Sequence, residues 1–383
     1  MKRLLFVTNG HGEIAVAARL AREVQSRRPV ACDHLALVGD FAYPSTLREV
    51  GPRRRMPSGG VIAMGNVRNI LRDVRAGLLS HTLAQLRFLR ETRGAYDAAV
   101  AVGDVFSLAM ALQARATATV FVGTAKSVYV APYGRFEERI VRKADRAFVR
   151  DAATARRLRL HGIDAVAANA IVDLYAEDAE EVDVAFDPAL AVFPGSRDPA
   201  YDDACTIARV VAEIAQAFPN AGALLSIAPG IDPQRLAERL SGDGWNVVRR
   251  EDRRAPFSLR RGNRELLRAW SGSPSAILRR ACVALGQAGT ANEAAAALGI
   301  PVVAFARTGE RRTPWYRMRQ IGLLDGAMMV THAEPRRAAS DVAALLRDPA
   351  RMRRMAHIGR ERMGPAGAAA RIAAEIAALA YGE

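Results

Sequence analysis

Short apolar runs alternate with longer amphipathic stretches along most of the chain. In the first half, runs that predict buried strands lie at 4–8, 34–39, 98–103, 119–123, 147–150 and 165–168. In the second half they lie at 189–193, 223–228, 246–248, 281–285, 301–305 and 327–330. Between the runs, apolar residues recur at helical spacing, as at 14–27 and 68–90. Strands alternating with helices predict an α/β protein with doubly wound parallel sheets.

The strand–helix alternation occurs twice, which predicts two Rossmann-like domains facing a cleft. An acidic segment at 175–183 separates the halves and is typical of a linker. We therefore expect a first domain over 1–180 and a second over 181–365, and 383 residues suit two domains of ordinary size. A last helix is expected within 366–383, after Gly364 and Pro365, and the pattern leaves its packing open.

The formal net charge of +15 is carried almost entirely by arginine. Such a charge favours anionic partners: lipid headgroups, nucleotides or nucleic acid. Aromatic residues make up only 6% of the chain and no zinc-finger or RNP pattern occurs, so we expect no nucleic-acid partner. Three widely spaced cysteines predict neither a disulfide framework nor a metal site, and a reducing cytoplasm is expected. No apolar run approaches the ~20 residues that span a bilayer, and the N-terminus reads as a strand rather than a signal peptide.

One βαβ unit in the second half, GQAGTANEAAAALGIPVVAF at 286–305, combines a glycine turn with a helix start. Gly286 and Gly289 allow a tight turn and a close approach of the backbone to a ligand. The helix start offers N–H groups to a phosphate, and Thr290 can cap the helix. Glu293, about one turn further on, can accept hydrogen bonds from a ribose diol. The alternative is an ordinary structural βαβ unit with an N-cap threonine.

A second glycine turn follows the first strand of the same half. Gly195 and Ser196 form a tight turn before a helix, and Arg197 supplies a planar cation suited to a diphosphate. Two such loops from one sheet can hold a nucleotide diphosphate between them.

Two strand ends in the first half carry candidate acid–base groups. The first strand runs into Asn-Gly-His-Gly-Glu, so His11 and Glu13 are expected to point into the ligand crevice. Asp104 follows the strand at 98–103 and is a candidate base for a hydroxyl group. The alternatives are that His11 shapes the turn, that Glu13 favours the helix start, and that Asp104 is an N-cap. The loop lacks the G-x-G-x-x-G spacing, which argues against a dinucleotide-binding dehydrogenase.

The segment at 59–90 predicts a helix that is apolar on one side and rich in arginine on another. Val67, Leu71, Val74 and Leu78 share one face, and Arg68, Arg72 and Arg75 share a different one. Such a helix can lie on an anionic membrane surface. The alternative is a core-packed helix with a solvated basic face.

The motifs FPGSR at 193–197 and GTANE at 289–293 resemble the nucleotide-sugar half of lipid-A-disaccharide synthases, and the order of the other motifs is similar over most of the chain. The resemblance implies a GT-B fold and an inverting, metal-independent, cofactor-free transfer of a hexose or N-acetylhexosamine from a UDP-sugar to a lipid-linked acceptor. It implies Asp104 as the base, with His11 as the other candidate. The loop at 9–13 departs from the family's pattern. In the family this loop faces the acceptor, so the departure concerns the identity of the acceptor. The residues expected to hold UDP are Gly195, Ser196, Arg197, Gln287, Gly289, Thr290 and Glu293.

Two other functions fit the same fold: a UDP-sugar 2-epimerase, and a non-catalytic relative that binds nucleotide sugars. For the transferase we expect a cytoplasmic protein associated with the inner face of the cell membrane. A homodimer is compatible with the sequence.

Overall fold

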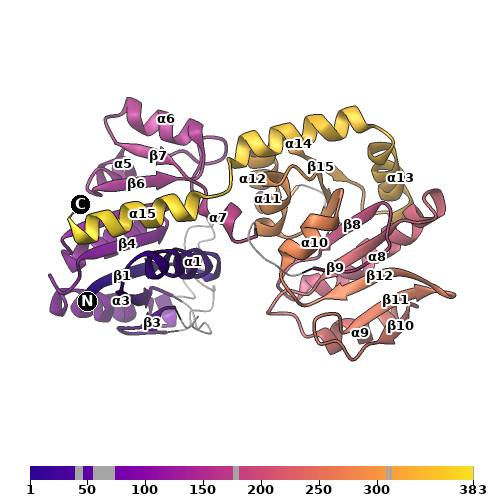
Figure 1. Cartoon of the computed structure of the whole chain (residues 1–383), viewed down its shortest axis with the longest axis horizontal. Helices are drawn as coiled ribbons and strands as arrows, with labels where there is room; N and C mark the ends of the chain where they lie inside the picture. The colour runs from indigo at the N-terminus through magenta and orange to yellow at the C-terminus, as the bar shows by residue number, and fades with distance from the viewer. Residues whose placement is uncertain (39–45, 55–73, 176–180, 308, 310–312, 383) are drawn as a thin grey trace. The chain divides into compact units, whose positions relative to one another are not determined.

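The computed structural model describes residues 1–38, 46–54, 74–175, 181–307, 309 and 313–382. It contains two compact units (Figure 1). Unit 1 comprises Met1–Leu174 and Gly364–Glu383, and unit 2 comprises Tyr175–Met363. Each unit has its own β-sheet and its own hydrophobic cores.

Unit 1 is built on a seven-stranded parallel sheet with the order β3-β2-β1-β4-β5-β6-β7. Its strands are β1 (Lys2–Thr8), β2 (Val30–Ala36), β3 (Arg48–Glu49), β4 (Ala98–Gly103), β5 (Ala118–Gly123), β6 (Arg146–Val149) and β7 (Ala165–Ala167). Its described helices are α1 (His11–Arg27), α3 (Leu78–Glu91), α4 (Val105–Ala111), α5 (Arg135–Val141), α6 (Ala152–Leu160), α7 (Ala170–Asp173) and α15 (Ala368–Tyr381), with a 3-10 turn at Leu112–Ala114.

Helices cover both faces of this sheet, as a doubly wound fold requires. Leu20 of α1 and Ile372 of α15 belong to the core on one face. Leu89 of α3, Leu108 of α4 and Leu158 of α6 belong to the core on the other. The strands are buried on both sides, which explains why they read as continuous apolar runs rather than alternating ones.

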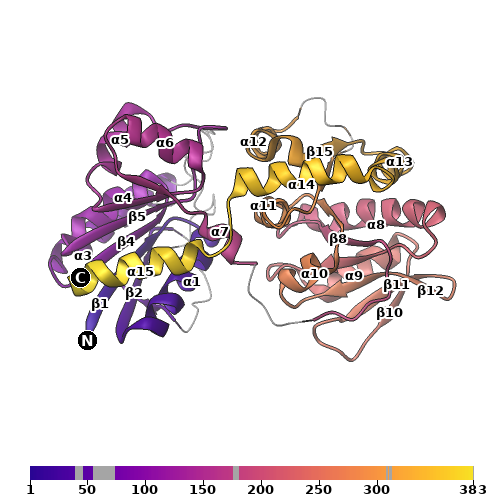
Figure 2. The same ribbon diagram turned by 45° about the horizontal axis from the view of Figure 1, so that its top comes forward.

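The last helix packs on unit 1, which answers the question that the sequence leaves open. Figures 1 and 2 show α15, in yellow, lying along this unit. Asp173 accepts hydrogen bonds from the backbone N–H groups of Gly367 at 2.6 Å and Ala369 at 2.5 Å. At the other end, the Tyr381 hydroxyl donates to the Pro29 carbonyl at 3.0 Å. The chain therefore leaves unit 1 once and returns to it.

Unit 2 is built on an eight-stranded sheet with the order β10-β11-β12-β9-β8-β13-β14-β15. Its strands are β8 (Ala189–Phe193), β9 (Gly222–Ser226), β10 (Asn246–Arg249), β11 (Phe257–Arg261), β12 (Arg264–Trp270), β13 (Val283–Gly286), β14 (Val302–Phe305) and β15 (Met328–Thr331). Its described helices are α8 (Pro199–Ala217), α9 (Pro233–Gly242), α10 (Pro274–Arg280), α11 (Gly289–Ala297), α12 (Trp315–Leu324), α13 (Pro335–Leu346) and α14 (Pro349–Met363), with a 3-10 turn at Asp325–Ala327.

Strands β11 and β12 form an antiparallel hairpin that the apolar pattern does not predict. The two strands pair around a two-residue turn at Gly262 and Asn263, where Gly262 has a φ of +58°. A glycine-containing two-residue turn between apolar runs is a hairpin signal. Arginines and a glutamate on the exposed side of these strands mask that signal.

The second strand begins earlier in the chain than the apolar pattern predicts. It is expected at 34–39, but β2 begins at Val30 and ends at Ala36. The misplacement has a physical cause: Asp33 and His34 look unsuited to a buried strand, yet both are fully buried. Asp33 accepts hydrogen bonds from Arg3 and Arg48, and His34 bonds to Thr8.

In the part of the chain that the structure describes, the helix expected at 68–90 is interrupted by a turn at Ala76 and Gly77, with Val74 and Arg75 helical before it. Residues 55–73, which include Val67, Arg68, Leu71 and Arg72, lie outside the described residues. The described helix α3 begins after Gly77, which has a φ of +91°. Of the predicted apolar face, Leu78 is buried, as is Leu89 further along α3, whereas Val74 is 37% exposed.

Candidate functional site

Each sheet has a central position from which the chain proceeds to opposite sides of the sheet. In unit 1 it lies between β1 and β4, and in unit 2 between β8 and β13. Ligands of doubly wound folds bind in the crevice outside the carboxyl ends of the strands at such switch points. The candidate residues from the sequence follow these four strands.

In unit 2 the loop from β8 to α8 carries the first predicted phosphate-binding group. Gly195 has a φ of +124°, which suits glycine, and the exposed residues Ser196 and Arg197 follow it. Among the described residues, the Arg197 guanidinium makes no ion pair or hydrogen bond. An exposed and unneutralised guanidinium at this position is suited to bind an anion.

The neighbouring loop, from β13 to α11, lies beside the first one. Phe193 and Gly286 are paired in register, and the N–H groups of Gln287 and Ala288 donate to the Phe193 carbonyl at 2.9 and 3.2 Å. The two loops therefore lie side by side at the same edge of the sheet, as the sequence predicts. Gly289 is exposed, and a Cβ atom built on it would meet no atom within 4 Å.

Thr290 does not cap α11, contrary to our expectation. The N-cap is Ala288, in an extended conformation, and no side chain accepts a hydrogen bond at this helix start. The helix begins at Gly289, so Thr290 is its second residue and lies beyond the capping position. The uncapped helix start leaves its first N–H groups to a ligand or to water.

Gln287 has a structural role in addition to any contact with a ligand. Its side-chain N–H donates to the Phe305 carbonyl at 2.8 Å, and its Oε1 accepts from the buried Arg317 at 3.2 Å. The amide is thereby fixed between β14 and α12. It positions the loop and has little freedom to reach a nucleotide.

Glu293 lies in the first turns of α11, half-buried and close to Tyr175. Burial raises the pKa of Tyr175 to about 12, and the negative charge of Glu293 contributes to this shift. Tyr175 is not predicted as a site residue from the sequence, because it lies at the start of the expected linker and belongs to no motif.

Two further groups beside the loops were also missed. Asn292 is fully buried, and its side-chain N–H₂ donates to the Gly286 carbonyl and to Gln320, at 3.2 Å each. Arg307, after β14, pairs with Asp203 through both oxygens and donates to the Tyr316 hydroxyl at 2.8 Å. These bonds fix the loops of the unit 2 crevice relative to the sheet.

In unit 1, residues after β1 and β4 meet at the switch point. Asn9 donates to Asp104 at 3.0 Å, and Glu13 lies in the first turn of α1 against Gly10 and Gly103. Asp104 is the N-cap of α4 and accepts from the Ser107 N–H at 2.9 Å. The structural alternative for Asp104 is therefore confirmed, and a catalytic role for it stays a prediction.

His11 is the first residue of α1. Its side chain lies outside what the structure describes, so its role as a base stays a prediction as well.

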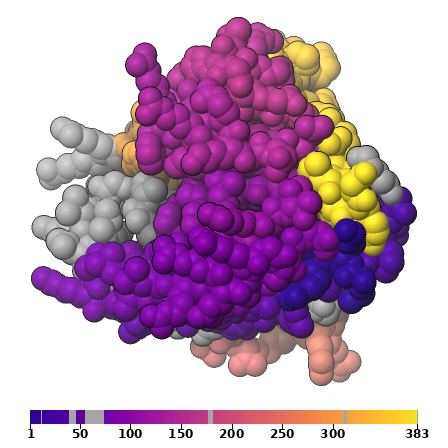
Figure 3. Space-filling view, turned by 90° about the vertical axis from the view of Figure 1, so that its left-hand side faces the viewer, coloured from indigo at the N-terminus to yellow at the C-terminus, as the bar shows by residue number. Residues whose placement is uncertain are grey.

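The outward side of α3 is unusual in being apolar. Leu79 and Leu83 are 63% and 66% exposed, and they are one turn apart. The exposed arginines Arg75, Arg87 and Arg90 flank them. The violet segment that includes α3 lies in the foreground of Figure 3, in the lower part of unit 1.

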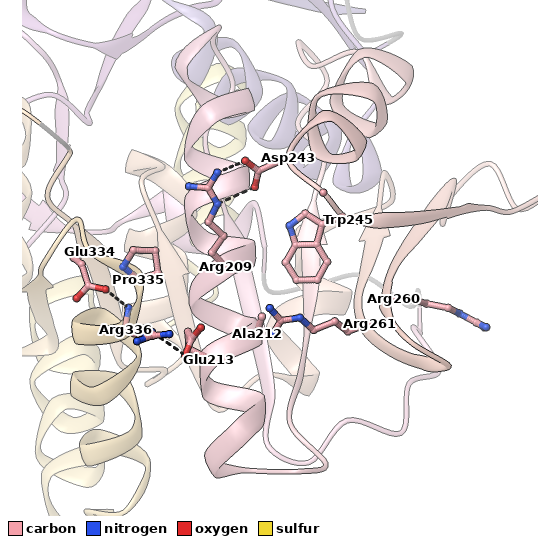
Figure 4. A pocket seen from close by; sticks show the side chains of 11 residues that line it. Arg209, Ala212, Glu213, Asp243, Trp245, Arg260, Arg261, Glu334, Pro335 and Arg336 are labelled. Atoms are coloured by element: carbon pink, nitrogen blue, oxygen red, sulfur yellow. Dashed lines mark hydrogen bonds and ion pairs between the residues drawn. The ribbon is translucent and has the colours of Figure 1, made fainter.

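Surface cavities of unit 2 lie away from these loops. One of about 390 Å³ lies between α8, the turn after α9 and the start of α13 (Figure 4). Figure 4 shows Arg209 bonded to Asp243, and Arg261 near Trp245. Glu213, which also lines this cavity, is about 21 Å along α8 from Pro199 at 1.5 Å per residue. Another, of about 650 Å³, is lined by residues such as Asp183, Arg254 and Trp270. Neither cavity includes the residues of the two loops.

Among the described residues, no group of three or more His, Cys, Asp or Glu side chains could hold a metal ion. In the same part of the chain, no helix is long and apolar enough to cross a membrane.

No protein-family profile and no curated protein sequence matches the chain. Its fold is similar to a structure assigned as a UDP-N-acetylglucosamine 2-epimerase from Listeria monocytogenes, with a TM-score of 0.61 and 14% identity, covering 100% of this chain and 98% of that one. It is similar to the calicheamicin glycosyltransferase CalG4, with a TM-score of 0.55 and 17% identity over 99% and 98% of the chains. It is also similar to UGT2 of Phytolacca americana complexed with UDP-2-fluoro-glucose and pterostilbene, with a TM-score of 0.61 and 12% identity, covering 100% of both chains. Such identities show the fold alone, and the predicted GT-B fold class is confirmed.

Proposed function

We propose that the protein is a UDP-sugar-dependent glycosyltransferase that moves a hexose or N-acetylhexosamine to a lipid-linked acceptor. The observation that carries the proposal is the pair of adjacent loops at the unit 2 switch point. One loop offers the unneutralised Arg197, and the other offers an uncapped helix start behind the exposed Gly289. Cation and helix start together suit a diphosphate.

In this proposal unit 2 binds the UDP part of the donor. Arg197 and the Ser196 turn neutralise and orient the diphosphate, while the N–H groups of Gly289 and Thr290 donate to its oxygens. Glu293 accepts from the ribose hydroxyls. The departing UDP gains negative charge in the transition state, so donors fixed at this point lower the barrier most. No metal is required for this chemistry.

Unit 1 contributes the proton acceptor, for which Asp104, His11 and Glu13 are the candidates. The acceptor hydroxyl attacks the anomeric carbon from the face opposite to UDP, which inverts the centre. The order of the motifs over most of the chain, which resembles that of lipid-A-disaccharide synthases, supports a lipid-linked acceptor.

The outward face of α3 supports membrane attachment on the cytoplasmic side. Leu79 and Leu83 supply apolar area that can enter the headgroup region, and Arg75, Arg87 and Arg90 supply attraction to anionic lipids. Glu91, the exposed last residue of α3, is the acidic residue of the segment from 74 to 91, so positive charge predominates there.

A UDP-sugar 2-epimerase is the second candidate, because epimerases and glycosyltransferases of this fold are both similar to the chain. The epimerase would use the same nucleotide loops and would need no acceptor.

Calorimetric titration with UDP, UDP-GlcNAc and UDP-glucose tests the nucleotide site, and we expect micromolar-range binding. Incubation with labelled UDP-GlcNAc alone, and then with a bacterial membrane lipid extract, separates the two reactions. Label that moves into the organic phase supports the transferase, and a new isomer of UDP-GlcNAc supports the epimerase. A protein that binds none of the three nucleotides is neither.

A further inference from the structure

The side chain of Glu13 fits into space left by two glycines from different strand ends. A Cβ atom on Gly10 would lie 2.6 Å from Glu13 Oε2, and one on Gly103 would lie 3.0 Å from Glu13 Cγ. Gly103 also has a φ of +127°, which side chains rarely adopt. The β1 turn and the end of β4 thus leave room for this carboxylate at the unit 1 switch point.

Asp104, in contrast, has both carboxylate oxygens engaged. Oδ1 accepts from the Ser107 N–H at 2.9 Å, and Oδ2 accepts from the Asn9 side chain at 3.0 Å. These bonds fix the orientation of Asp104. A carboxylate held in this way is suited to act on a neighbour rather than to move toward a substrate.

The surroundings of Glu13 make it a stronger base than an ordinary carboxylate. Burial raises the pKa of Glu13, and the negative charge of Asp104 raises it further, while a backbone hydrogen bond lowers it. Of the charged groups that the structure describes, Asp104 is the one whose charge acts on Glu13.

Asn9 adds a second observation at the same place. It is only 8% exposed, and its Oδ1 has no hydrogen-bond partner among the described residues. A buried acceptor of this kind is normally satisfied by a ligand group or by water. A hydroxyl-bearing ligand would satisfy it.

We propose that Glu13, rather than Asp104, is the catalytic base, and that Asp104 is a positioning residue that acts through it. The inference rests on the proposed function. Glu13 takes the proton of the acceptor hydroxyl as that oxygen forms its bond to the anomeric carbon. The bond from this carbon to the β-phosphate oxygen breaks, and its electron pair leaves with UDP. Glu13 then releases the proton to solvent.

The test compares Glu13→Gln with Asp104→Asn, using UDP released from UDP-GlcNAc in the presence of membrane lipid extract. We expect Glu13→Gln to lower kcat about 100-fold or more and to leave the Kd for UDP unchanged. Asp104→Asn should keep measurable turnover and move the acidic limb of the kcat–pH profile to lower pH, because one negative charge next to Glu13 is lost. Unchanged kcat in Glu13→Gln, or an unmoved acidic limb in Asp104→Asn, would overturn the assignment.

Carbon-13 NMR of protein labelled at the glutamate carboxyl carbon gives a readout that needs no turnover. The Glu13 signal, assigned by its loss in Glu13→Gln, should titrate above the ordinary glutamate range and return toward it in Asp104→Asn. A Glu13 signal that titrates normally overturns the inference even if the protein is a transferase. A protein that binds no UDP-sugar overturns the proposed function instead, whatever the NMR titration shows.

Discussion

Asn292 donates a hydrogen bond of 3.2 Å from the first turns of α11 to the carbonyl oxygen of Gly286, the last residue of β13. The same side chain bonds to Gln320, so it ties strand, helix α11 and helix α12 together. This contact fixes the direction in which α11 begins, and so where its N–H groups point. A Cβ atom at position 286 would collide with Asn292 Oδ1.

We therefore expect Gly286→Ala to lower the free energy of unfolding by about 1–3 kcal/mol through overpacking. It should also weaken UDP binding, because the start of α11 is displaced. Thermal unfolding and calorimetry measure the two effects.

Gly289→Ala is the matched control, since a methyl group there meets open space. Stability should stay the same or rise by about 0.5–1 kcal/mol, because Ala is the better helix former. UDP affinity should still fall if the ligand approaches the backbone at this residue. A Gly289→Ala variant that binds UDP normally would remove Gly289 from the site.

Arg197→Ala should weaken UDP binding about 10-fold or more, since a charge-assisted hydrogen bond contributes about 1.5–3 kcal/mol. Stability should change little because Arg197 is exposed. Arg261→Ala provides the comparison: Arg261 is likewise exposed and makes no ion pair among the described residues, and it lines the cavity away from the loops. Equal losses in the two variants would indicate a general charge effect and no specific site.

His34 predicts a pH dependence of stability. Burial lowers its pKa to about 4 from an ordinary value of 6.5, so the unfolded chain binds the proton more readily. The free energy of unfolding should fall as the pH drops from 6.5 to about 4, by up to about 3 kcal/mol, and change no further below that.

Urea unfolding between pH 4 and 7 measures this effect. His34→Gln should flatten the dependence in that window, whereas His332→Gln, at an exposed position of unit 2, should leave it in place. An unchanged slope in His34→Gln would show that another group is responsible.

The α3 surface predicts attachment to anionic vesicles. Replacing Leu79 and Leu83 together by serine should reduce co-sedimentation with phosphatidylglycerol vesicles about 10-fold, since two exposed apolar side chains lose their contact with lipid. Leu160→Ser is the control, because Leu160 is 79% exposed on α6 in the same unit. Equal binding of the double variant and the wild type would exclude α3 as the docking surface.

Much of the fold follows from local pattern. Buried parallel strands read as apolar runs, and β1, β4, β5, β8 and β14 lie where these runs predict them. Strand β2 was misplaced because its polar residues are paired through residues distant in sequence: Arg3 and Arg48 neutralise Asp33, and Thr8 bonds to His34. No local rule anticipates such partners.

Local sequence patterns are enough to predict the fold class, the two loops of unit 2 and the polar residues after β1 and β4. These depend on glycine turns and on strand–helix alternation, which are local. The three-dimensional fold was needed to show that α15 returns to unit 1, that Gln287 is bound to Phe305 and Arg317, and that Ala288 is the N-cap of α11. It also decided that Glu13 lies against Gly10 and Gly103 while Asp104 is fixed by Ser107 and Asn9. Those outcomes depend on which strands become neighbours in the sheet, because that pairing brings residues far apart in the sequence into contact.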